Sequence, residues 1–186
     1  VALAAVCGDS SVWKPSSLTP LTAIATIKIA ERVCRANNVD PAIFTLIIGD
    51  GATVGQRLLD DKRVPLISAT GSSKMGVRVA ESVGRRFGKT ILELGGNNAL
   101  IVAPSADMDL AVRAILFGAV GTAVQRCTTT RRIIVHESIR DALVKRLVKA
   151  YEQIPIGNPA QPGTLCGPLI NQQAVAEMQS ALEKVR

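Results

Sequence analysis

The stretch Thr-Ile-Leu-Glu-Leu-Gly-Gly-Asn-Asn-Ala-Leu-Ile-Val, residues 90–102, decides the fold of this chain. It holds two short apolar segments, 90–94 and 99–102, separated by a polar link that contains two glycines. Runs of this length without polar alternation are typical of strands in a parallel sheet that is covered on both faces. We therefore expect two buried strands here.

Strand and helix patterns alternate upstream of this stretch. The apolar spacing predicts strands at 11–14, 44–48 and 64–69 and helices at 19–36, 52–59 and 73–87. In the last helix, Met75, Val79 and Val83 recur at fourfold spacing, which places them on one buried face. Strands that alternate with helices form βαβ units. The sequence therefore predicts an α/β fold, with a Rossmann-like parallel sheet and helices on both faces.

Downstream, the same alternation continues. Asp107 is placed to cap a helix that runs to about Val120, and a strand is expected at 132–136. Ser138-x-x-Asp141 is typical of a helix start. Behind it we expect one apolar stripe, formed by Leu143, Val144, Leu147, Val148 and Tyr151. A loop at 157–168 then precedes a last amphipathic helix at 171–186.

Composition excludes several classes of function. The 186 residues are 47% hydrophobic and 20% charged, as in ordinary globular domains. The net charge of +7 could indicate nucleic-acid binding, but the basic residues are dispersed and aromatic residues make up only 3%. We expect a solvated basic surface and no nucleic-acid partner.

Neither a zinc site nor a membrane segment is expected. The four cysteines lie far apart, at positions 7, 34, 127 and 166, with only one histidine in the chain. No apolar run approaches the length that spans a bilayer, and the first residues lack the charged start of a signal peptide. These features favour reduced thiols in the cytoplasm. The initial Val1 in place of Met indicates a fragment or a processed chain.

Cys127 is the leading candidate for a nucleophile. It lies in the polar turn Gln-Arg-Cys-Thr, residues 125–128, where a partly exposed thiol beside the cationic Arg126 and a nearby helix start favour the thiolate. The alternative is that the thiol packs as a small hydrophobe, as free cysteines usually do. Cys7, Cys34 and Cys166 have no such neighbours and are expected to be structural.

Glu93 is the leading candidate for a base. It ends an apolar strand beside Gly95-Gly96, where a carboxylate is costly unless it is paired or functional. Burial there would make it a better proton acceptor at neutral pH. The alternative is a surface or salt-bridged glutamate. A thiol and a carboxylate in one short chain suggest covalent chemistry on a carbonyl followed by hydrolysis.

Two motifs carry a resemblance to a known family. The active-site signatures of the NAD(P)-dependent aldehyde dehydrogenases resemble Glu-Leu-Gly-Gly at 93–96 and Gln-Arg-Cys at 125–127. The extended motifs, Glu-Leu-Gly-Gly-Asn-Asn at 93–98 and Gln-Arg-Cys-Thr-Thr at 125–129, resemble those of the antiquitin-like branch of α-aminoadipic semialdehyde dehydrogenases. The resemblance implies a dinucleotide-binding domain at 1–94, incomplete at its N-terminus. It also implies that 95–186 is the first part of an α/β catalytic domain, incomplete at its C-terminus.

The resemblance also implies a cofactor site for NAD, with NADP not excluded. Residues 70–76 sit where a strand meets a helix, and helix N-termini favour anions. In the family a matching run binds the pyrophosphate, although Ser72 could instead be only an N-cap. Lys-Pro-Ser at 14–16 matches the segment that contacts the adenosine ribose, and Gly51 would let the backbone lie against the adenine. The implied cofactor residues are Lys14, Pro15, Ser16, Ser17, Gly51, Gly71, Ser72, Gly76 and Leu94.

Three positions depart from the family pattern. Val124 stands where the family has glycine, and a β-branched residue restricts the turn that presents the thiol. Ala69 replaces the usual phenylalanine. Ser17 replaces the ribose-binding glutamate of many NAD-preferring members, so NAD and NADP are not distinguished. Arg126, in contrast, is kept in the antiquitin-like branch, where a guanidinium suits the carboxylate of an amino-dicarboxylate semialdehyde.

The implied reaction oxidises an aldehyde to a carboxylate, with L-2-aminoadipate 6-semialdehyde as the expected substrate. Cys127 would form a thiohemiacetal and then a thioester, which water activated by Glu93 would hydrolyse. The family's oxyanion asparagine and its nicotinamide-ribose glutamate lie outside this stretch, as do its oligomerisation strands, so we expect little turnover from the chain alone. A homo-oligomer is expected only for the full-length family member. The alternatives are a non-catalytic dinucleotide-binding or interaction fragment and a CoA-acylating relative, against which Glu93 argues.

Overall fold

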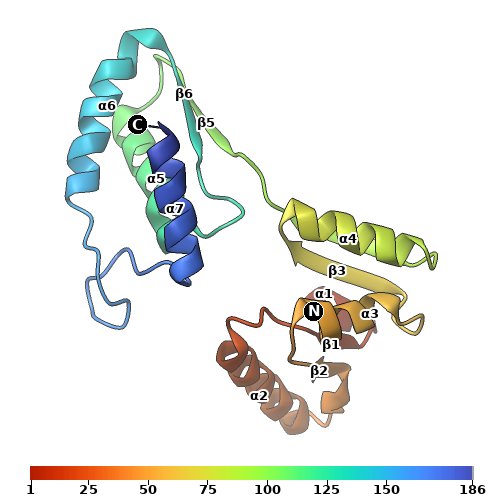
Figure 1. Cartoon of the computed structure of the whole chain (residues 1–186). Coiled ribbons are helices and arrows are strands. Elements are labelled where there is room, and N and C mark those ends of the chain that lie inside the picture. Colours follow the sequence, from red (N-terminus) through yellow and green to blue (C-terminus); the bar gives the residue numbers. More distant parts are fainter. Residues whose placement is uncertain (186) are drawn as a thin grey trace. The chain divides into compact units, whose positions relative to one another are not determined.

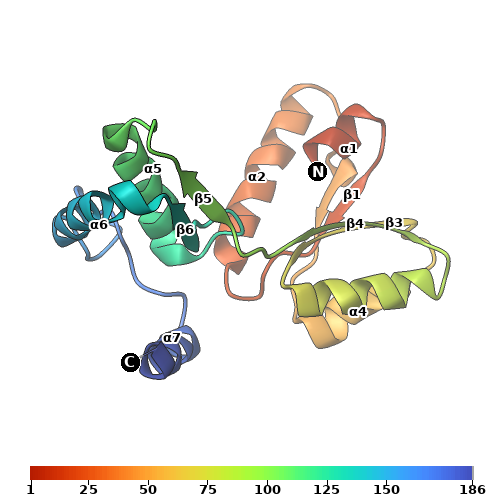
Figure 2. The same ribbon diagram turned by 90° about the horizontal axis from the view of Figure 1, so that it is seen from above.

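The computed structural model describes residues 1–185 and divides into two compact units, Val1–Glu93 and Leu94–Arg186. Each unit is described by itself, and Figures 1 and 2 give two views of its elements. Among residues 1–185, none of the helices is both long enough and apolar enough to cross a lipid bilayer.

The first unit pairs its strands in two small sheets. β1 (Ser11–Trp13) and β2 (Phe44–Leu46) run parallel, with Ser11 opposite Phe44 and Trp13 opposite Leu46. β3 (Leu66–Gly71) pairs with β4 (Lys89–Leu94). The helical elements are α1 (Ala2–Val6), α2 (Pro20–Ala36), η1 (Pro41–Ile43), η2 (Gly51–Gly55), α3 (Gln56–Asp60) and α4 (Ser73–Gly84).

The expected α/β class with parallel strands is confirmed, but the pairing is more divided than expected. Within residues 1–185 the strands form three two-stranded sheets, β1–β2, β3–β4 and β5–β6, rather than one continuous sheet. α1, near the N-terminus, was not expected from the sequence. Its five residues include no buried side chain, so it leaves no amphipathic pattern to detect.

α4 and the β3–β4 pair form the core of the first unit. Val79 and Val83 are buried together with Leu59, and Met75 packs against them, so the predicted fourfold spacing is confirmed. α4 runs alongside β3 in both views (Figures 1 and 2). The helix ends at Gly84 rather than at the predicted Phe87, because Phe87 adopts a left-handed φ of 58° and is exposed.

The predicted helix at 52–59 forms in two parts. Gly51–Gly55 is a π-helical turn, and α3 follows it. Asp50 starts this segment by accepting hydrogen bonds from the backbone N–H groups of Ala52 (2.8 Å) and Thr53 (2.7 Å). These bonds lower the pKa of the Asp50 carboxyl, with the Thr53 N–H the largest contributor.

The second unit packs two helices against one face of a parallel strand pair. β5 (Ala99–Val102) and β6 (Arg132–Val135) pair with Ala99 opposite Arg132 and Val102 opposite Val135. α5 (Met108–Val120) and α6 (Glu137–Glu152) lie on the same side of this pair in both figures. The buried core between them comprises Val102, Ala111, Ile115 and Leu143. Asp107 caps α5 as expected, and α7 (Gln172–Val185) ends the described chain, so position 186 of the predicted last helix lies outside the described residues.

α6 begins differently from the prediction. Its N-cap is His136, whose ring Nδ1 accepts a hydrogen bond from the Ser138 N–H, so Ser138-x-x-Asp141 is not the capping box. Asp141 instead pairs with Arg140. Of the predicted apolar stripe, only Leu143 is buried and Leu147 packs beside it. Val144, Val148 and Tyr151 are exposed.

Candidate active site

The loop that carries Cys127 follows α5 through an unusual backbone. A short helical turn, η3 (Gly121–Val124), places Thr122, Ala123 and Val124 at φ values of 55°, 51° and 67°. Left-handed φ is uncommon for residues with a Cβ and a genuine outlier for a β-branched one. The expectation that Val124 disfavours this turn therefore has a concrete basis in the backbone.

Cys127 is exposed at the tip of this loop. The loop closes on itself in a turn, because the Thr129 N–H donates to the Arg126 carbonyl at 3.2 Å. Thr129 is fully buried, and its hydroxyl accepts from the Arg126 N–H at 3.2 Å. The thiol is thus accessible while the backbone beneath it is held.

Asn98, which the sequence did not single out, fastens this loop to the start of β5. Its side-chain Nδ2 donates to the carbonyl oxygens of Cys127 (2.6 Å) and Thr129 (3.0 Å). Its own carbonyl accepts from the N–H groups of Arg131 and Arg132. In the sequence, Asn98 could be noticed only as an asparagine inside the 93–98 motif. The spacing of residues does not predict that it contacts Cys127, 29 positions away.

Arg126 turns back onto α5. Its Nη2 donates to the Phe117 carbonyl at 2.9 Å, and its guanidinium carbon lies 5.0 Å from the centroid of the Phe117 ring. Within residues 1–185 its buried Nε has no hydrogen-bond partner. The substrate role of Arg126 stays a prediction.

Gln125 links the same loop to the segment before α7. Its Oε1 accepts from the Ile170 N–H at 2.8 Å, and its Nε2 donates to the Thr122 carbonyl at 3.1 Å. The loop that carries Cys127 is therefore tied on two sides, to β5 by Asn98 and to residue 170 by Gln125.

Glu93 closes the first unit and is exposed, so the expectation that it is buried is wrong. The reason lies in the alternation along β4. Leu92 packs against the α4 core, whereas Ile91 and Glu93 point to the opposite, open face. Glu93 belongs to the first unit and Cys127 to the second.

The expected ribose segment follows β1. Lys14 Nζ donates to the carbonyl oxygens of Pro15 (2.8 Å) and Gly49 (2.9 Å). An ammonium has three donors, so one N–H stays available for a hydroxyl. Pro15 is buried, while Ser16 and Ser17 are exposed, and the Ser16 hydroxyl accepts from the Leu18 N–H. The contact with Gly49 brings this segment beside the turn that contains Gly51.

The expected phosphate segment starts α4. The Ser72 hydroxyl caps the helix by accepting from the Met75 N–H at 3.2 Å. A hydroxyl that accepts can still donate to a phosphate oxygen, so the capping and phosphate roles are compatible. A Cβ at Gly71 would clash with the Met75 methyl, whereas a Cβ at Gly51 would meet no protein atom within 4 Å. Gly76 is buried one turn into α4, and Leu94 is half-buried at the end of β4.

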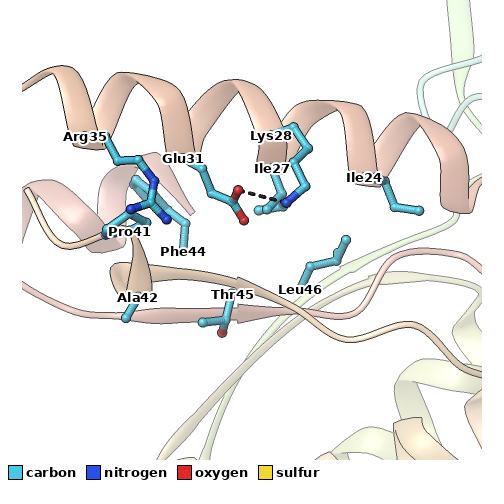
Figure 3. A pocket seen from close by; sticks show the side chains of 10 residues that line it. All are labelled: Ile24, Ile27, Lys28, Glu31, Arg35, Pro41, Ala42, Phe44, Thr45 and Leu46. Carbon is cyan, nitrogen blue, oxygen red and sulfur yellow. Dashed lines mark hydrogen bonds and ion pairs between the residues drawn. The ribbon is translucent and has the colours of Figure 1, made fainter.

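A groove of about 420 Å³ lies elsewhere in the first unit, between α2 and β2 (Figure 3). Ile24 and Ile27 line it from the helix and Leu46 from the strand, and Lys28 pairs with Glu31 at 2.9 Å on its rim. None of the candidate site residues lines it. Within residues 1–185, no cluster of His, Cys, Asp or Glu is suited to hold a metal ion.

Comparison with known proteins is consistent across sequence and structure. The model of the aldehyde dehydrogenase family matches residues 1–186. A putative aldehyde dehydrogenase family 7 member A1 homolog of Dictyostelium discoideum is 51% identical, and an α-aminoadipic semialdehyde dehydrogenase of Bos taurus is 47% identical. Both matches cover 100% of this chain but only 36% and 34% of those proteins.

Solved structures agree. The glyceraldehyde-3-phosphate dehydrogenase GapN of Methanocaldococcus jannaschii, complexed with NADP, superposes with a TM-score of 0.88 at 36% identity, over 93% of this chain and 38% of that one. A betaine aldehyde dehydrogenase of Staphylococcus aureus, in complex with NAD+, gives a TM-score of 0.86 at 33% identity, over 94% and 34%. The chain thus spans about a third of the length of the relatives it matches.

Proposed function

This chain belongs to the aldehyde dehydrogenase family, and on that premise we propose that it carries the nucleophile and the hydrolytic base of an NAD(P)-dependent aldehyde dehydrogenase. The observation that carries the proposal is the exposed Cys127 thiol on a loop whose backbone is held from two sides. A thiol needs access to substrate and a fixed direction of attack, and this loop combines the two.

The proposed chemistry is the one that the family resemblance implies for these side chains. The Cys127 thiolate attacks the aldehyde carbon and forms a thiohemiacetal, whose oxyanion the Cys127 N–H stabilises. When bound, NAD(P) would supply the hydride acceptor needed to oxidise this adduct to a thioester. The exposed Glu93 carboxylate deprotonates a water that hydrolyses the thioester and frees the thiol.

The residues present fit a dinucleotide. The third N–H of Lys14 suits a ribose hydroxyl, and the start of α4 offers Ser72 and the positive end of a helix to a pyrophosphate. A Cβ at Gly51 would meet no protein atom within 4 Å, and the family resemblance implies that this glycine lets the backbone lie close to an adenine. Ser17 introduces no carboxylate that would repel a 2′-phosphate, so both NAD and NADP fit.

The proposed substrate is a small aldehyde, L-2-aminoadipate 6-semialdehyde. The relative from Bos taurus that is 47% identical bears that activity in its name. Arg126 supplies a guanidinium that could pair with the substrate carboxylate. For the full-length family member we also propose a homo-oligomer in the cytoplasm.

Thiol reactivity tests the nucleophile. Iodoacetamide labelling near neutral pH, followed by peptide mass mapping, compares the reaction rate of Cys127 with that of Cys7, which is also exposed. We expect Cys127 to react at least about tenfold faster, as an activated thiolate does. Equal rates would contradict the proposal and favour a non-catalytic dinucleotide-binding fragment.

Trp13 fluorescence tests the cofactor site. Trp13 is the only tryptophan and directly precedes Lys14, so its emission reports binding at this segment. Ser72→Asp keeps a good N-cap but places a carboxylate against the pyrophosphate, and Ser72→Asn keeps the cap without charge. We expect the Asp variant to weaken NAD binding at least about tenfold by charge repulsion, while the Asn variant changes it little. Equal loss in both would refute the phosphate site.

A further inference from the structure

Two peptide planes flank Cys127, and the structure holds each by a different hydrogen bond. The plane before Cys127 is held by its carbonyl, that of Arg126, which accepts from the Thr129 N–H at 3.2 Å. The plane after Cys127 is held by its own carbonyl, which accepts from Asn98 Nδ2 at 2.6 Å. Fixing both planes sets the backbone dihedrals of Cys127 and hence the direction of its Cα–Cβ bond.

The same geometry aims the Cys127 N–H. In a trans peptide the carbonyl and the following N–H point in opposite directions. The Arg126 carbonyl is engaged on the turn side, so the Cys127 N–H faces away from the turn. Within residues 1–185 no protein group accepts from it. It is available to an oxyanion that forms on a carbonyl attacked by the thiolate.

We propose that Asn98 is a positioning residue for Cys127: its side-chain amide fixes the peptide plane after the nucleophile and so aligns the thiol with its own N–H. This rests on the proposed nucleophilic role of Cys127. Asn98 suits the task because one amide group spans the Cys127 and Thr129 carbonyls, while its backbone carbonyl anchors Arg131 and Arg132 at the start of β6. Without this side chain, the loop keeps its own turn and the Gln125–Ile170 hydrogen bond, but the Cys127 carbonyl loses its partner.

Asn97 provides a matched control. It is the adjacent residue, it has the same side chain, and it is exposed. Among the described residues, only the backbone carbonyl of Asn97 forms hydrogen bonds, as acceptor for the Arg132 guanidinium at 2.7 Å. Asn97→Ala leaves that carbonyl in place, whereas Asn98→Ala removes both donors to the loop. Asn98→Asp is a second variant that keeps the shape of the side chain and removes the donors.

Two reagents separate positioning from simple accessibility. With p-nitrophenyl acetate, the thiolate forms a C–S bond at the ester carbonyl through an oxyanion, and the C–O bond to nitrophenolate then breaks. With iodoacetamide, the thiolate displaces iodide at a saturated carbon and no oxyanion forms. The ratio of the two rates at Cys127 therefore reports the alignment of thiol and N–H, and a variant that only changes exposure moves both rates together.

The experiment measures this ratio in the full 186-residue chain for the wild type and the three variants, with folding checked by circular dichroism. Removing a single oxyanion donor typically costs hundredfold or more, so misaligning one should lower the ratio at least about tenfold in Asn98→Ala and Asn98→Asp. Asn97→Ala should keep the wild-type ratio. Equal ratios in the Asn98 and Asn97 variants would overturn the proposal. If iodoacetamide labels Cys127 of the wild type no faster than Cys7, the nucleophilic role of Cys127 is wrong. Failure of the Asn98 proposal and failure of the proposed function therefore give different results.

Discussion

The left-handed residues that precede the loop of Cys127 allow a prediction about stability that depends only on the backbone conformation. Thr122, Ala123 and Val124 all have φ between 51° and 67°. Each such residue with a Cβ costs about 1–2 kcal/mol relative to the right-handed form, and glycine escapes that cost. Thr122 and Val124 are strained more than Ala123, because both of their side chains are β-branched.

Two substitutions at position 124 isolate this strain. Val124→Ala and Val124→Gly both remove a side chain that is 51% exposed, so they lose similar burial. Only glycine populates φ of 67° freely, and its greater freedom in the unfolded chain offsets part of the gain. We expect the Gly variant to have a free energy of unfolding about 1 kcal/mol higher than the Ala variant.

Urea unfolding followed by circular dichroism measures this difference. Ala114 is the control, because it is exposed in the interior of α5, where Ala114→Gly should lower the free energy of unfolding by about 1 kcal/mol. The same alanine-to-glycine step thus has opposite signs at the two positions. A Val124→Ala variant at least as stable as Val124→Gly would refute the left-handed backbone at this position.

Two further predictions concern the scaffold. Arg86 donates to the carbonyls of Leu59 and Val64 at 2.7 Å each, so Arg86→Met should lower the free energy of unfolding in urea by about 1.5–3 kcal/mol, as expected for charged hydrogen bonds, and an unchanged midpoint would contradict this role. Asp107 caps α5, and the N–H groups of Leu110 and then Asp109 lower the pKa of its carboxyl. Its contribution is therefore present above its ordinary value, near pH 4, and is lost as pH falls through the lowered pKa. Thermal melts between pH 6 and pH 2 should show a smaller loss of stability for Asp107→Asn than for the wild type, and parallel curves would contradict the cap.

Much of the secondary structure follows from local patterns. The fourfold spacing of Met75, Val79 and Val83 marks a helix face that is in fact buried, and Asp107 starts α5 as its residue type predicts. Both signals depend on neighbours within one or two turns. Where a competing local bond exists, the same reasoning is wrong: His136 takes the cap that Ser138 was expected to provide, and α6 starts earlier.

The site depends on contacts that no local pattern contains. The burial expected for Glu93 is wrong because an apolar strand can still present alternate residues to an open face, and Ile91 is itself 51% exposed. Asn98 reaches Cys127 across 29 positions, and Gln125 reaches Ile170 across 45. These pairings join residues far apart in the sequence, so residue types could suggest the candidate nucleophile but not what holds it.

The most direct test of the account is the lifetime of an acyl group on Cys127. The central claim is that Glu93 activates the water that hydrolyses a Cys127 thioester. Acylation by p-nitrophenyl acetate forms this thioester without any cofactor, and intact-mass measurements follow its decay. Glu93→Gln should prolong the acyl-Cys127 lifetime by about hundredfold or more, as loss of a general base does. Glu81→Gln, at an exposed position in α4, should leave the lifetime unchanged. Equal lifetimes in the wild type and Glu93→Gln would contradict the claim.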